Sequence, residues 1–294
     1  MNNRCLLVDS NNICYIQRHG MGSLSHDDQP TGIIFGFMQT ILWLAKNYDT
    51  NQFAFAWDSR KSYRSKIYPK YKSTRKARRE NQTEEEREQS RISYEQFVRL
   101  QEDILPTLNF VNNFIQTGIE ADDIIASCVQ NNDGYQFIIV STDQDLWQLL
   151  APNVSIHNPS TKRLMTFKMF QEAYDIAPRK WRRVKALAGC STDDVHGIPG
   201  VGNKIALRYI HGELPVRTKT YQKIVSAEGR KIYNRNMQLV SLPFERTKEY
   251  IIQETKPSIS QFIDICQLFN FRSFLYSDTY SRWCKYVFKE GLTV

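Results

Sequence analysis

Residues 137–145 read FIIVSTDQD, four apolar residues followed within three positions by the first of two aspartates. Two other short runs have the same form. Residues 5–8 (CLLV) lead directly into Asp9, and residues 53–57 (FAFAW) lead directly into Asp58. Short apolar runs bounded by polar residues are typical of buried β-strands. We therefore expect strands that end beside carboxylates.

A fourth, less regular run, residues 110–119, leads into the acidic sequence EADD at 120–123. Stretches with helical spacing of apolar residues separate the four runs. These expected helices span residues 32–45, 90–105 and 122–130. Alternation of strands and helices predicts an α/β domain with a mostly parallel sheet.

The carboxyl ends of parallel strands meet at one edge of the sheet, which is where ligands bind. Seven acidic residues would gather there: Asp9, Asp58, Glu120, Asp122, Asp123, Asp143 and Asp145. Two like charges 4 Å apart repel by about 1 kcal/mol in water and about 4 kcal/mol at an effective dielectric of 20. Any single one, such as Asp122, could simply cap a helix. The whole set, all oxygen donors, instead predicts a Mg²⁺ or Mn²⁺ site.

The net charge of +8 is concentrated in one segment. Residues 59–79 hold ten basic residues and no acid, which leaves 29 basic against 31 acidic residues elsewhere. Tyr63, Tyr68 and Tyr71 lie among these cations, so the segment could grip phosphates while rings stack on bases. The alternative is a solvated loop. The amphipathic helix that follows is expected to end at Pro106.

A second basic region surrounds the sequence GIPGVGNKIA, residues 197–206. It has the form of a helix-hairpin-helix, in which glycines let the backbone approach a phosphate and Lys204 adds charge. A plain glycine turn between helices is the alternative. Together, an acidic metal site and two basic segments predict two-metal hydrolysis of a phosphodiester, the chemistry of a nuclease.

Five motifs give the sequence a family resemblance. They are LLVDSNN (6–12), FAWDSRKSYRSKIYPKYKSTR (55–75), EADD (120–123), STDQDLWQLL (141–150) and VKALAGCSTDDVHGIPGVGNKIA (184–206). In this order they resemble the 5′-nuclease family of phage 5′-exonucleases, phage ribonuclease H, flap endonucleases and the 5′-nuclease domain of bacterial DNA polymerase I. The resemblance implies a PIN-like catalytic domain at 1–178 with a helical arch at about 60–105. It also implies a helical DNA-binding region at 179–294, with the hairpin motif at about 184–210.

The resemblance also implies roles for individual residues. Asp9, Asp58, Glu120 and Asp122 look like ligands of a first metal ion, and Asp123, Asp143, Asp145 and Asp193 like ligands of a second or its outer shell. Lys72 and Arg75 match arch cations that contact the scissile phosphate, so Lys72, Arg75, Asp9 and Asp122 are the expected catalytic set. The expected DNA contacts are Arg64, Lys70, Tyr71, Lys185, Gly197, Gly200, Gly202 and Lys204, with a K⁺ ion at the hairpin.

One residue departs from the family pattern. Cys190 stands where the family has the first aspartate of a second-metal pair, and a thiol is a poor Mg²⁺ ligand. Compensation by Asp194 or water, weak second-metal binding with a shift toward Mn²⁺, and impaired activity are the three readings, of which we favour the second. The expected function is 5′-to-3′ cleavage of flapped, nicked, branched or RNA-primed DNA. A DNA-binding protein with weakened catalysis and a PIN-type endoribonuclease are the alternatives.

The remaining sequence features exclude other classes. The most apolar stretch, residues 32–45, is too short to span a membrane, and the N-terminus does not look like a signal peptide. Six cysteines lie far apart without a CxxC pair, so reduced thiols are expected. We expect a cytoplasmic monomer that meets replication proteins in trans.

Overall fold

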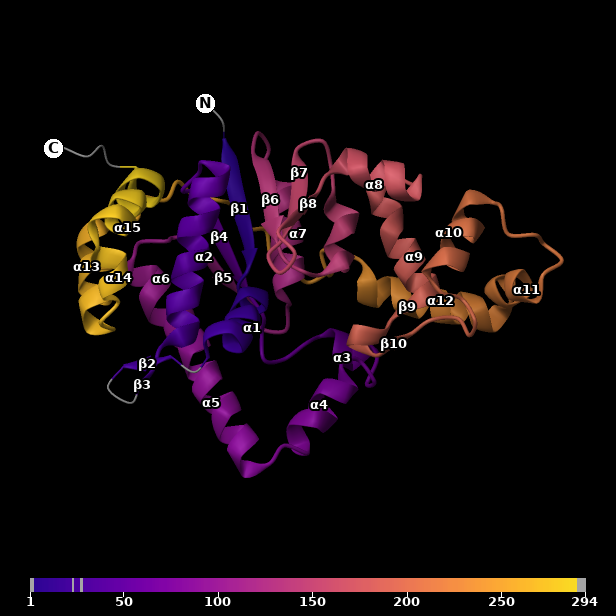
Figure 1. Cartoon of the computed structure of the whole chain (residues 1–294). Helices are drawn as coiled ribbons and strands as arrows, with labels where there is room; N and C mark the ends of the chain where they lie inside the picture. The colour runs from indigo at the N-terminus through magenta and orange to yellow at the C-terminus, as the bar shows by residue number, and fades with distance from the viewer. Residues whose placement is uncertain (1–2, 23, 27–28, 290–294) are drawn as a thin grey trace.

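The fold is built on one mixed sheet whose strand order is β5-β4-β1-β6-β7-β8 (Figure 1). The computed structural model describes residues 3–22, 24–26 and 29–289. The strands are β1 (Arg4–Asp9), β4 (Phe53–Trp57), β5 (Asn113–Ile115), β6 (Gln136–Val140), β7 (Val154–Asn158) and β8 (Arg163–Met165). All neighbouring pairs are parallel except β7 with β8. The predicted, mostly parallel α/β fold is therefore confirmed.

The strand predictions differ in accuracy. β4 has the predicted bounds, and β1 and β6 are each longer by one or two residues. The run at 110–119 yields only the three residues of β5, because the chain turns at Gly118, where φ is +85° and the ring of Tyr63 fills the space that a Cβ would need. The strands β7 and β8 were not predicted.

Both faces of the sheet are covered, which explains why its strands are continuous apolar runs rather than alternating ones. In β1, Leu6 and Val8 face one core whereas Cys5 and Leu7 face the other. In β4, large aromatic rings point into the first core and alanines into the second.

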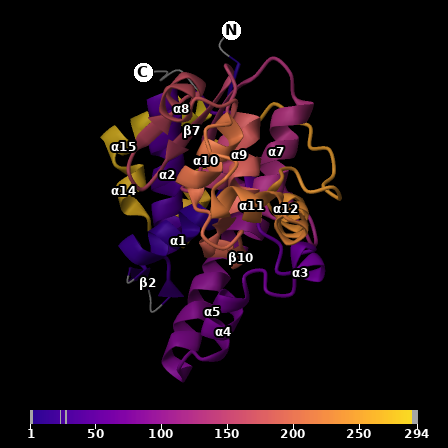
Figure 2. The ribbon, with the colours of Figure 1, turned by 90° about the vertical axis from the view of Figure 1, so that its right-hand side faces the viewer.

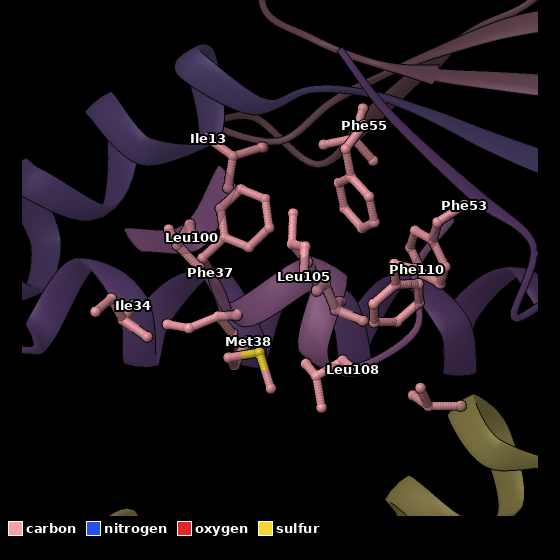
Figure 3. Close-up of a cluster of buried hydrophobic side chains, with 14 of the residues drawn as sticks. Ile13, Ile34, Phe37, Met38, Phe53, Phe55, Leu100, Leu105, Leu108 and Phe110 are labelled. Carbon is pink, nitrogen blue, oxygen red and sulfur yellow. The ribbon is translucent and has the colours of Figure 1, made fainter. Parts of the chain in front are cut away.

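The first core lies between the sheet and α1 (Ser10–Met21), α2 (Gly32–Tyr48) and the helical segment that ends the arch. Figure 3 shows Phe37 and Met38 of α2 packed with Phe55 of β4 and Leu105. Helix α2 contains the whole stretch predicted as a buried helix. It ends at Asp49, whose left-handed conformation stops the helix.

The second core joins the sheet to α7 (Ala121–Asn131) and to the helices of the hairpin region. These are η2 (Gln144–Leu149), α8 (Phe167–Tyr174), η3 (Pro178–Lys180), α9 (Trp181–Ala188), α10 (Asn203–His211), α11 (Lys219–Val225) and α12 (Ala227–Val240). Between α9 and α10 lie β9 (Gly189–Cys190), η4 (Ser191–Asp193) and β10 (Val195–His196). A further small hairpin is formed by β2 (Ser25–His26) and β3 (Gln29–Pro30).

The predicted arch is a V-shaped projection at the carboxyl edge of the sheet (Figure 1), and in Figure 2 it is seen from the side, with α4 and α5 overlapping. Its elements are α3 (Arg64–Ile67), α4 (Ser73–Glu80), α5 (Glu84–Arg99), η1 (Leu100–Ile104) and α6 (Leu105–Thr107). Helix α4 has no buried residue. Helix α5 begins with a capping box in which Thr83 and Glu86 bond reciprocally to each other's backbone N–H. The predicted helix end at Pro106 is early by one residue, because Pro106 lies inside α6, which ends at Thr107.

The predicted division of the chain after residue 178 does not describe its packing. The last helices, α13 (Ile259–Leu268), α14 (Arg272–Leu275), α15 (Ser277–Arg282) and η5 (Trp283–Phe288), lie beside α2, away from the hairpin region (Figure 1). Phe262 and Trp283 belong to the first core, so this segment packs with the sheet and α2. Within the described residues, no helix is long and apolar enough to cross a membrane.

Candidate active site

Asp9 and Asp58 lie side by side at the carboxyl edge, each held by backbone groups. One oxygen of Asp9 accepts a hydrogen bond from the N–H of Asn12 at 3.0 Å, and the other accepts from Oγ of Ser141 at 2.9 Å. Asp58 accepts from the N–H of Ala121 at 2.9 Å, which ties β4 to the start of α7. Asp9 thus caps α1 and also belongs to the acidic cluster. An aspartate at the end of a strand can therefore cap a helix and still be available to a metal ion.

The carboxylates of this edge raise one another's pKa. Burial and the neighbouring Asp58 raise the pKa of Asp9 to about 7. Burial, together with Asp143 and Asp9, raises the pKa of Asp122 well above its usual range. Burial and Asp145 raise the pKa of Asp143. Crowded carboxylates with raised pKa values mark a place where a bound cation would be strongly favoured.

Glu120 is the exception, because cations already neutralise it. Nζ of Lys72 lies 2.8 Å from Oε2 of Glu120, to which the Tyr71 hydroxyl also donates a hydrogen bond of 2.8 Å. Ser62 donates to the other oxygen at 2.9 Å. Burial acts to raise the pKa of Glu120, but Lys72 and Arg64 lower it to about 2. The carboxylate is therefore ionised and already provided with partners.

The arch cations reach the same cluster through Asp193. Oδ1 of Asp193 lies 3.0 Å from the Arg75 guanidinium and 3.8 Å from Nζ of Lys72. Burial acts to lower the pKa of Lys72, but Glu120 and Asp193 raise it above its ordinary value. The structure thus brings the two predicted phosphate-binding cations, Lys72 and Arg75, to the predicted metal ligands. This geometry depends on a left-handed backbone at Lys72, with φ of 53°.

Two predicted site residues instead form a buried ion pair. The guanidinium of Arg64 donates to both oxygens of Asp123, at 2.6 and 2.8 Å, and Asp123 also accepts from the N–H of Phe244 at 2.7 Å. Asp123 is fully buried and Arg64 is 3% exposed. The prediction that Arg64 contacts DNA and that Asp123 contributes to a metal site is therefore wrong. The two residues join the base of the arch to α7.

The tyrosines of the basic segment also differ from prediction. The predicted stacking of Tyr71 on a base is wrong in this arrangement, because its side chain is 7% exposed and its hydroxyl holds Glu120. Tyr68 packs under the guanidinium of Arg235, 4.3 Å from the ring centroid. Tyr63 stacks against Phe244. All three rings support the base of the arch rather than face solvent as a row.

Two of the predicted contacts in the hairpin region have structural roles. Lys185 is largely buried, and its Nζ lies 2.7 Å from Oδ1 of Asp145, so it is not a free contact for duplex DNA. A Cβ at Gly197 would lie 2.2 Å from the backbone of Ala188, so close packing explains this glycine. Neither residue fits the predicted DNA-contacting role.

The tip of the hairpin retains the predicted binding features. Gly200 has φ of +84°, and a Cβ at Gly200 or at Gly202 would meet no other atom within 4 Å. The backbone there is open to an approaching ligand. Gly202 caps α10, and Lys204 is exposed in its first turn. Lys70 of the arch is also exposed, so it is free to contact phosphate.

The second predicted metal position contains the residue that departs from the family pattern. Ligand atoms of Asp145, Cys190 and Asp193 all lie within 4.8 Å of one another. The Cys190 sulfur lies 3.0 Å from Oγ1 of Thr192, and burial and Asp145 raise its thiol pKa to about 11. Asp194 does not join this set, because both of its oxygens are bonded to Thr74.

One basic surface was missed by the sequence analysis. A hollow of about 710 Å³ runs along one face of α12. Its lining residues are Ala227, Arg230, Lys231, Asn234, Arg235 and Gln238. They recur at three- and four-residue spacing and include no acid, a pattern that the sequence already contains. The guanidinium of Arg235 donates to the carbonyl of His196 at 2.7 Å, which places this face next to the hairpin.

Comparison with known proteins identifies the family. Residues 4–175 match the family model described as "5′-3′ exonuclease, N-terminal resolvase-like domain". The chain is 32% identical over 234 residues to a 5′-3′ exonuclease of Buchnera aphidicola subsp. Schizaphis graminum, which covers 78% of this chain and 72% of the relative. The chain belongs to the 5′-3′ exonuclease family. Its predicted resemblance and its class, a metal-dependent, structure-specific 5′-nuclease, are thereby confirmed.

Further comparisons show how far the similarity extends. It is 28% identical over 211 residues to the thermostable DNA polymerase I of Thermus thermophilus, which is 70% of this chain but 24% of the polymerase. The zinc-bound structure of the bacteriophage T5 5′-exonuclease has a TM-score of 0.70 and 25% identity, covering 82% of this chain and 90% of that one. Flap endonuclease-1 of Methanococcus jannaschii, at 15% identity and a TM-score of 0.61, covers 98% of this chain and 92% of its own, and shows the shared PIN-like fold.

The donor atoms of this 5′-nuclease fit a divalent metal at the first position. Asp9, Asp58 and Asp122 offer only carboxylate oxygens. Burial and the negative charge of a neighbouring carboxylate raise the pKa of each. Hard cations such as Mg²⁺ and Mn²⁺ prefer such donors. The second position fits Mg²⁺ less well, because its set of three includes the thiol of Cys190.

Proposed function

We propose that this nuclease hydrolyses phosphodiester bonds near the 5′ ends of flapped, nicked or branched DNA, including RNA-primed ends, with Mg²⁺ or Mn²⁺. One observation carries the proposal. Burial and neighbouring carboxylates raise the pKa values of Asp9, Asp122 and Asp143. At the same edge of the sheet lie Lys72 and Arg75, two cations that can bind a phosphate. Carboxylates that need a cation and cations that can bind a phosphate are the two halves of a metal-dependent phosphodiesterase.

We assign the first metal to Asp9, Asp58 and Asp122, with Glu120 beside them. The second metal would lie at Asp145 and Asp193, with Asp143 in its outer shell. When bound, the metals would lower the pKa of an attacking water and neutralise charge on the leaving oxygen. The chain's own part is to hold these carboxylates in place. Asn12 and Ser141 fix the two oxygens of Asp9, and Ala121 fixes Asp58.

We assign the scissile phosphate to Lys72 and Arg75. In the free protein these cations pair with Glu120 and Asp193. A phosphate would compete for the same guanidinium and ammonium donors, while the metals would take over the carboxylates. The exposed Arg75, with 53% of its side chain open to solvent, is the better placed to bind the substrate first.

The duplex on one side of the cut would lie on the hairpin and on α12. The open backbone at Gly200 and Gly202 and the charge of Lys204 suit the phosphates of one strand. The α12 face adds Arg230 and Lys231, which would extend the contact along the backbone. These groups read charge and shape rather than base sequence. A K⁺ ion at the hairpin belongs to the same proposal, and binding in KCl against NaCl tests it.

The proposal also includes a monomer in the cytoplasm that meets other replication proteins in trans. Its support is the class of its relatives, which are named 5′-3′ exonucleases and DNA polymerase I. Sedimentation of the protein with and without flap DNA measures the oligomeric state. A dimer in the DNA-bound state would contradict it.

The direct experiment uses 5′-labelled flap, nicked, RNA-primed and blunt duplexes with Mg²⁺, Mn²⁺ or EDTA. Cleavage near the 5′ end of branched substrates, abolished by EDTA and by Asp122→Asn, is expected. Asp264→Asn is the matched control, because Asp264 is exposed on α13, away from the acidic cluster. Equal product in EDTA would overturn the metal mechanism.

One observation favours a second candidate, a flap-binding protein with weakened catalysis. The buried thiol of Cys190 occupies the second metal position. This candidate predicts binding of flap DNA without product at any concentration of Mg²⁺ or Mn²⁺. Cleavage of single-stranded RNA in preference to every duplex would instead indicate a PIN-type endoribonuclease.

A further inference from the structure

We propose that the second metal position of this nuclease is a mixed thiolate and carboxylate site that takes a thiophilic divalent cation, such as Zn²⁺ or Cd²⁺, in preference to Mg²⁺. Its ligands are Asp145, Cys190 and Asp193. The inference rests on the proposed metal-dependent function and specifies the chemistry of one of its two metal positions.

The three ligands come from two stretches of the chain that the fold brings together. Asp145 lies in η2, Cys190 in β9 and Asp193 in η4. Strand β9 is paired with β10 through Cys190 and Val195, so the thiol is held by a backbone ladder. The ligand atoms already lie within 4.8 Å of one another. Around a tetrahedral ion with Zn–S of about 2.3 Å and Zn–O of about 2.0–2.2 Å, ligand atoms lie roughly 3.5 Å apart, so a small contraction closes the site.

Asp145 supplies a second observation at this position. Its side chain is only 11% exposed, and its Oδ1 atom forms no directed hydrogen bond but lies 2.7 Å from Nζ of Lys185. The charge of this oxygen is therefore balanced by one ion pair, for which a metal ion could compete. This oxygen belongs to one of the three ligands. A metal ion between Asp145 and Cys190 would satisfy it, and Lys185 would turn toward the adjacent Asp143.

Cys190 then decides which ion binds. Mg²⁺ requires near-ideal octahedral oxygen ligands and gains little from sulfur, whereas Zn²⁺ and Cd²⁺ bind thiolates strongly. Metal binding forms the metal–sulfur bond and breaks the S–H bond, and the proton passes to the buffer. Three protein ligands leave the fourth tetrahedral position open for water or a phosphate oxygen, the arrangement of catalytic rather than structural zinc sites.

The test measures metal binding directly. Metal-free protein is titrated with Cd²⁺ or Co²⁺ while the thiolate-to-metal charge-transfer band is recorded, and Zn²⁺ is then added as a competitor. One equivalent should produce the band, Zn²⁺ should abolish it, and a large excess of Mg²⁺ should leave it unchanged. Absence of the band in the wild-type protein, or its loss on adding Mg²⁺, would overturn the proposal.

Variants show which residues hold the ion. Cys190→Ser and Cys190→Asp should lose the band, whereas the matched control Cys266→Ser, which removes a buried thiol of α13, should keep it. Asp145→Asn keeps the thiol but should weaken Cd²⁺ binding by at least the roughly tenfold that an outer-shell partner contributes. Unchanged affinity in Asp145→Asn would mean that sulfur acts alone, and the site would be refuted. Circular dichroism verifies the fold of each variant.

The same proteins separate this inference from the proposed function. If the band is absent but Mg²⁺ still supports flap cleavage, the nuclease stands and the thiophilic site does not. If the band is present but no divalent cation supports cleavage, the site stands and the proposed function does not.

Discussion

Arg64 and Asp123 form a bidentate ion pair inside the base of the arch, with N···O distances of 2.6 and 2.8 Å. Arg64 also donates to the carbonyl of Leu239 at 2.7 Å, and Asp123 accepts from the N–H of Phe244. This pair therefore connects three parts of the chain: the arch, α7, and α12 with the segment that follows it. Its neighbour Glu120 is the carboxylate that Lys72 contacts, so the pair positions the active site without belonging to it.

Replacing Arg64 should destabilise the whole fold. In Arg64→Ala, Asp123 is left charged, buried and unpaired, and breaking such a pair costs about 3–5 kcal/mol in the free energy of unfolding. Urea unfolding followed by circular dichroism measures this loss. Arg91→Ala is the control, because Arg91 pairs with Glu88 on the solvent side of α5, where a surface ion pair contributes little to stability. Equal losses in both variants would refute the structural role of Arg64.

Lys72→Ala should reduce kcat far more than it reduces DNA binding. Lys72 lies among the acidic residues, so we place its charge at the reacting phosphate, and loss of one such donor typically lowers kcat by about 10²- to 10³-fold. Single-turnover cleavage of a labelled flap measures the effect. The control is Lys168→Ala, since Lys168 is exposed on α8. A rise in Kd that accounts for the entire loss of activity would show that Lys72 only binds DNA.

Stabilisation by metal should grow as the pH rises. Burial and Asp58 raise the pKa of Asp9 to about 7, so the folded metal-free protein holds a proton there at pH values where the unfolded chain does not. This contribution to stability is fully present at low pH and is lost as the pH rises through about 7. Mn²⁺ requires the ionised carboxylate, so its increase of Tm should be small near pH 5.5 and large near pH 8.

Thermal unfolding with and without Mn²⁺ across this range checks the pH prediction. Asp9→Asn removes the titrating group, so the metal-induced rise in Tm should become smaller and flatter with pH. A wild-type rise that is the same at every pH would contradict the assignment of Asp9 as a metal ligand.

Cys190→Asp should increase activity at limiting Mg²⁺. The substitution supplies the oxygen donor that the family has at this position, beside Asp145 and Asp193. The measurement is the Mg²⁺ concentration that gives half-maximal flap cleavage, which should fall in Cys190→Asp and stay unchanged in Cys266→Ser. Unchanged metal dependence in Cys190→Asp would count against a metal at this position.

The sequence was sufficient for strands β1, β4 and β6 and for the acidic residues at their carboxyl ends. Apolar runs as clear as β4 specify both a strand and its end, and the acid that follows, Asp58, is then placed by topology. The basic segment was recognised from its charge, and the arch was implied by the family resemblance. What charge could not show is that Arg64, one of ten cations in the segment, turns inward, because pairing with Asp123 depends on a contact across 59 residues of chain.

Other errors have similar causes. The motif containing Asp123 predicts a metal ligand. Although Asp123 is next to Asp122 in the sequence, its side chain is buried and bonded to Arg64 and to the N–H of Phe244. The last helices were expected to belong to the DNA-binding region, but Phe262 and Trp283 pack in the first core. Neither outcome is visible in local patterns, since both depend on side chains that meet only after the chain has folded.

The α12 face should contribute to binding but not to chemistry. Lys231→Glu reverses a charge in the basic hollow beside the hairpin, so it should raise the Kd for flap DNA and reduce the dependence of binding on salt by about one released ion. It should leave the single-turnover rate at saturating protein unchanged. Lys168→Glu makes the same charge change on α8, remote from the hollow, and should bind as the wild type does. If both variants bind equally, or if Lys231→Glu slows the saturated rate, α12 is not a duplex-binding surface.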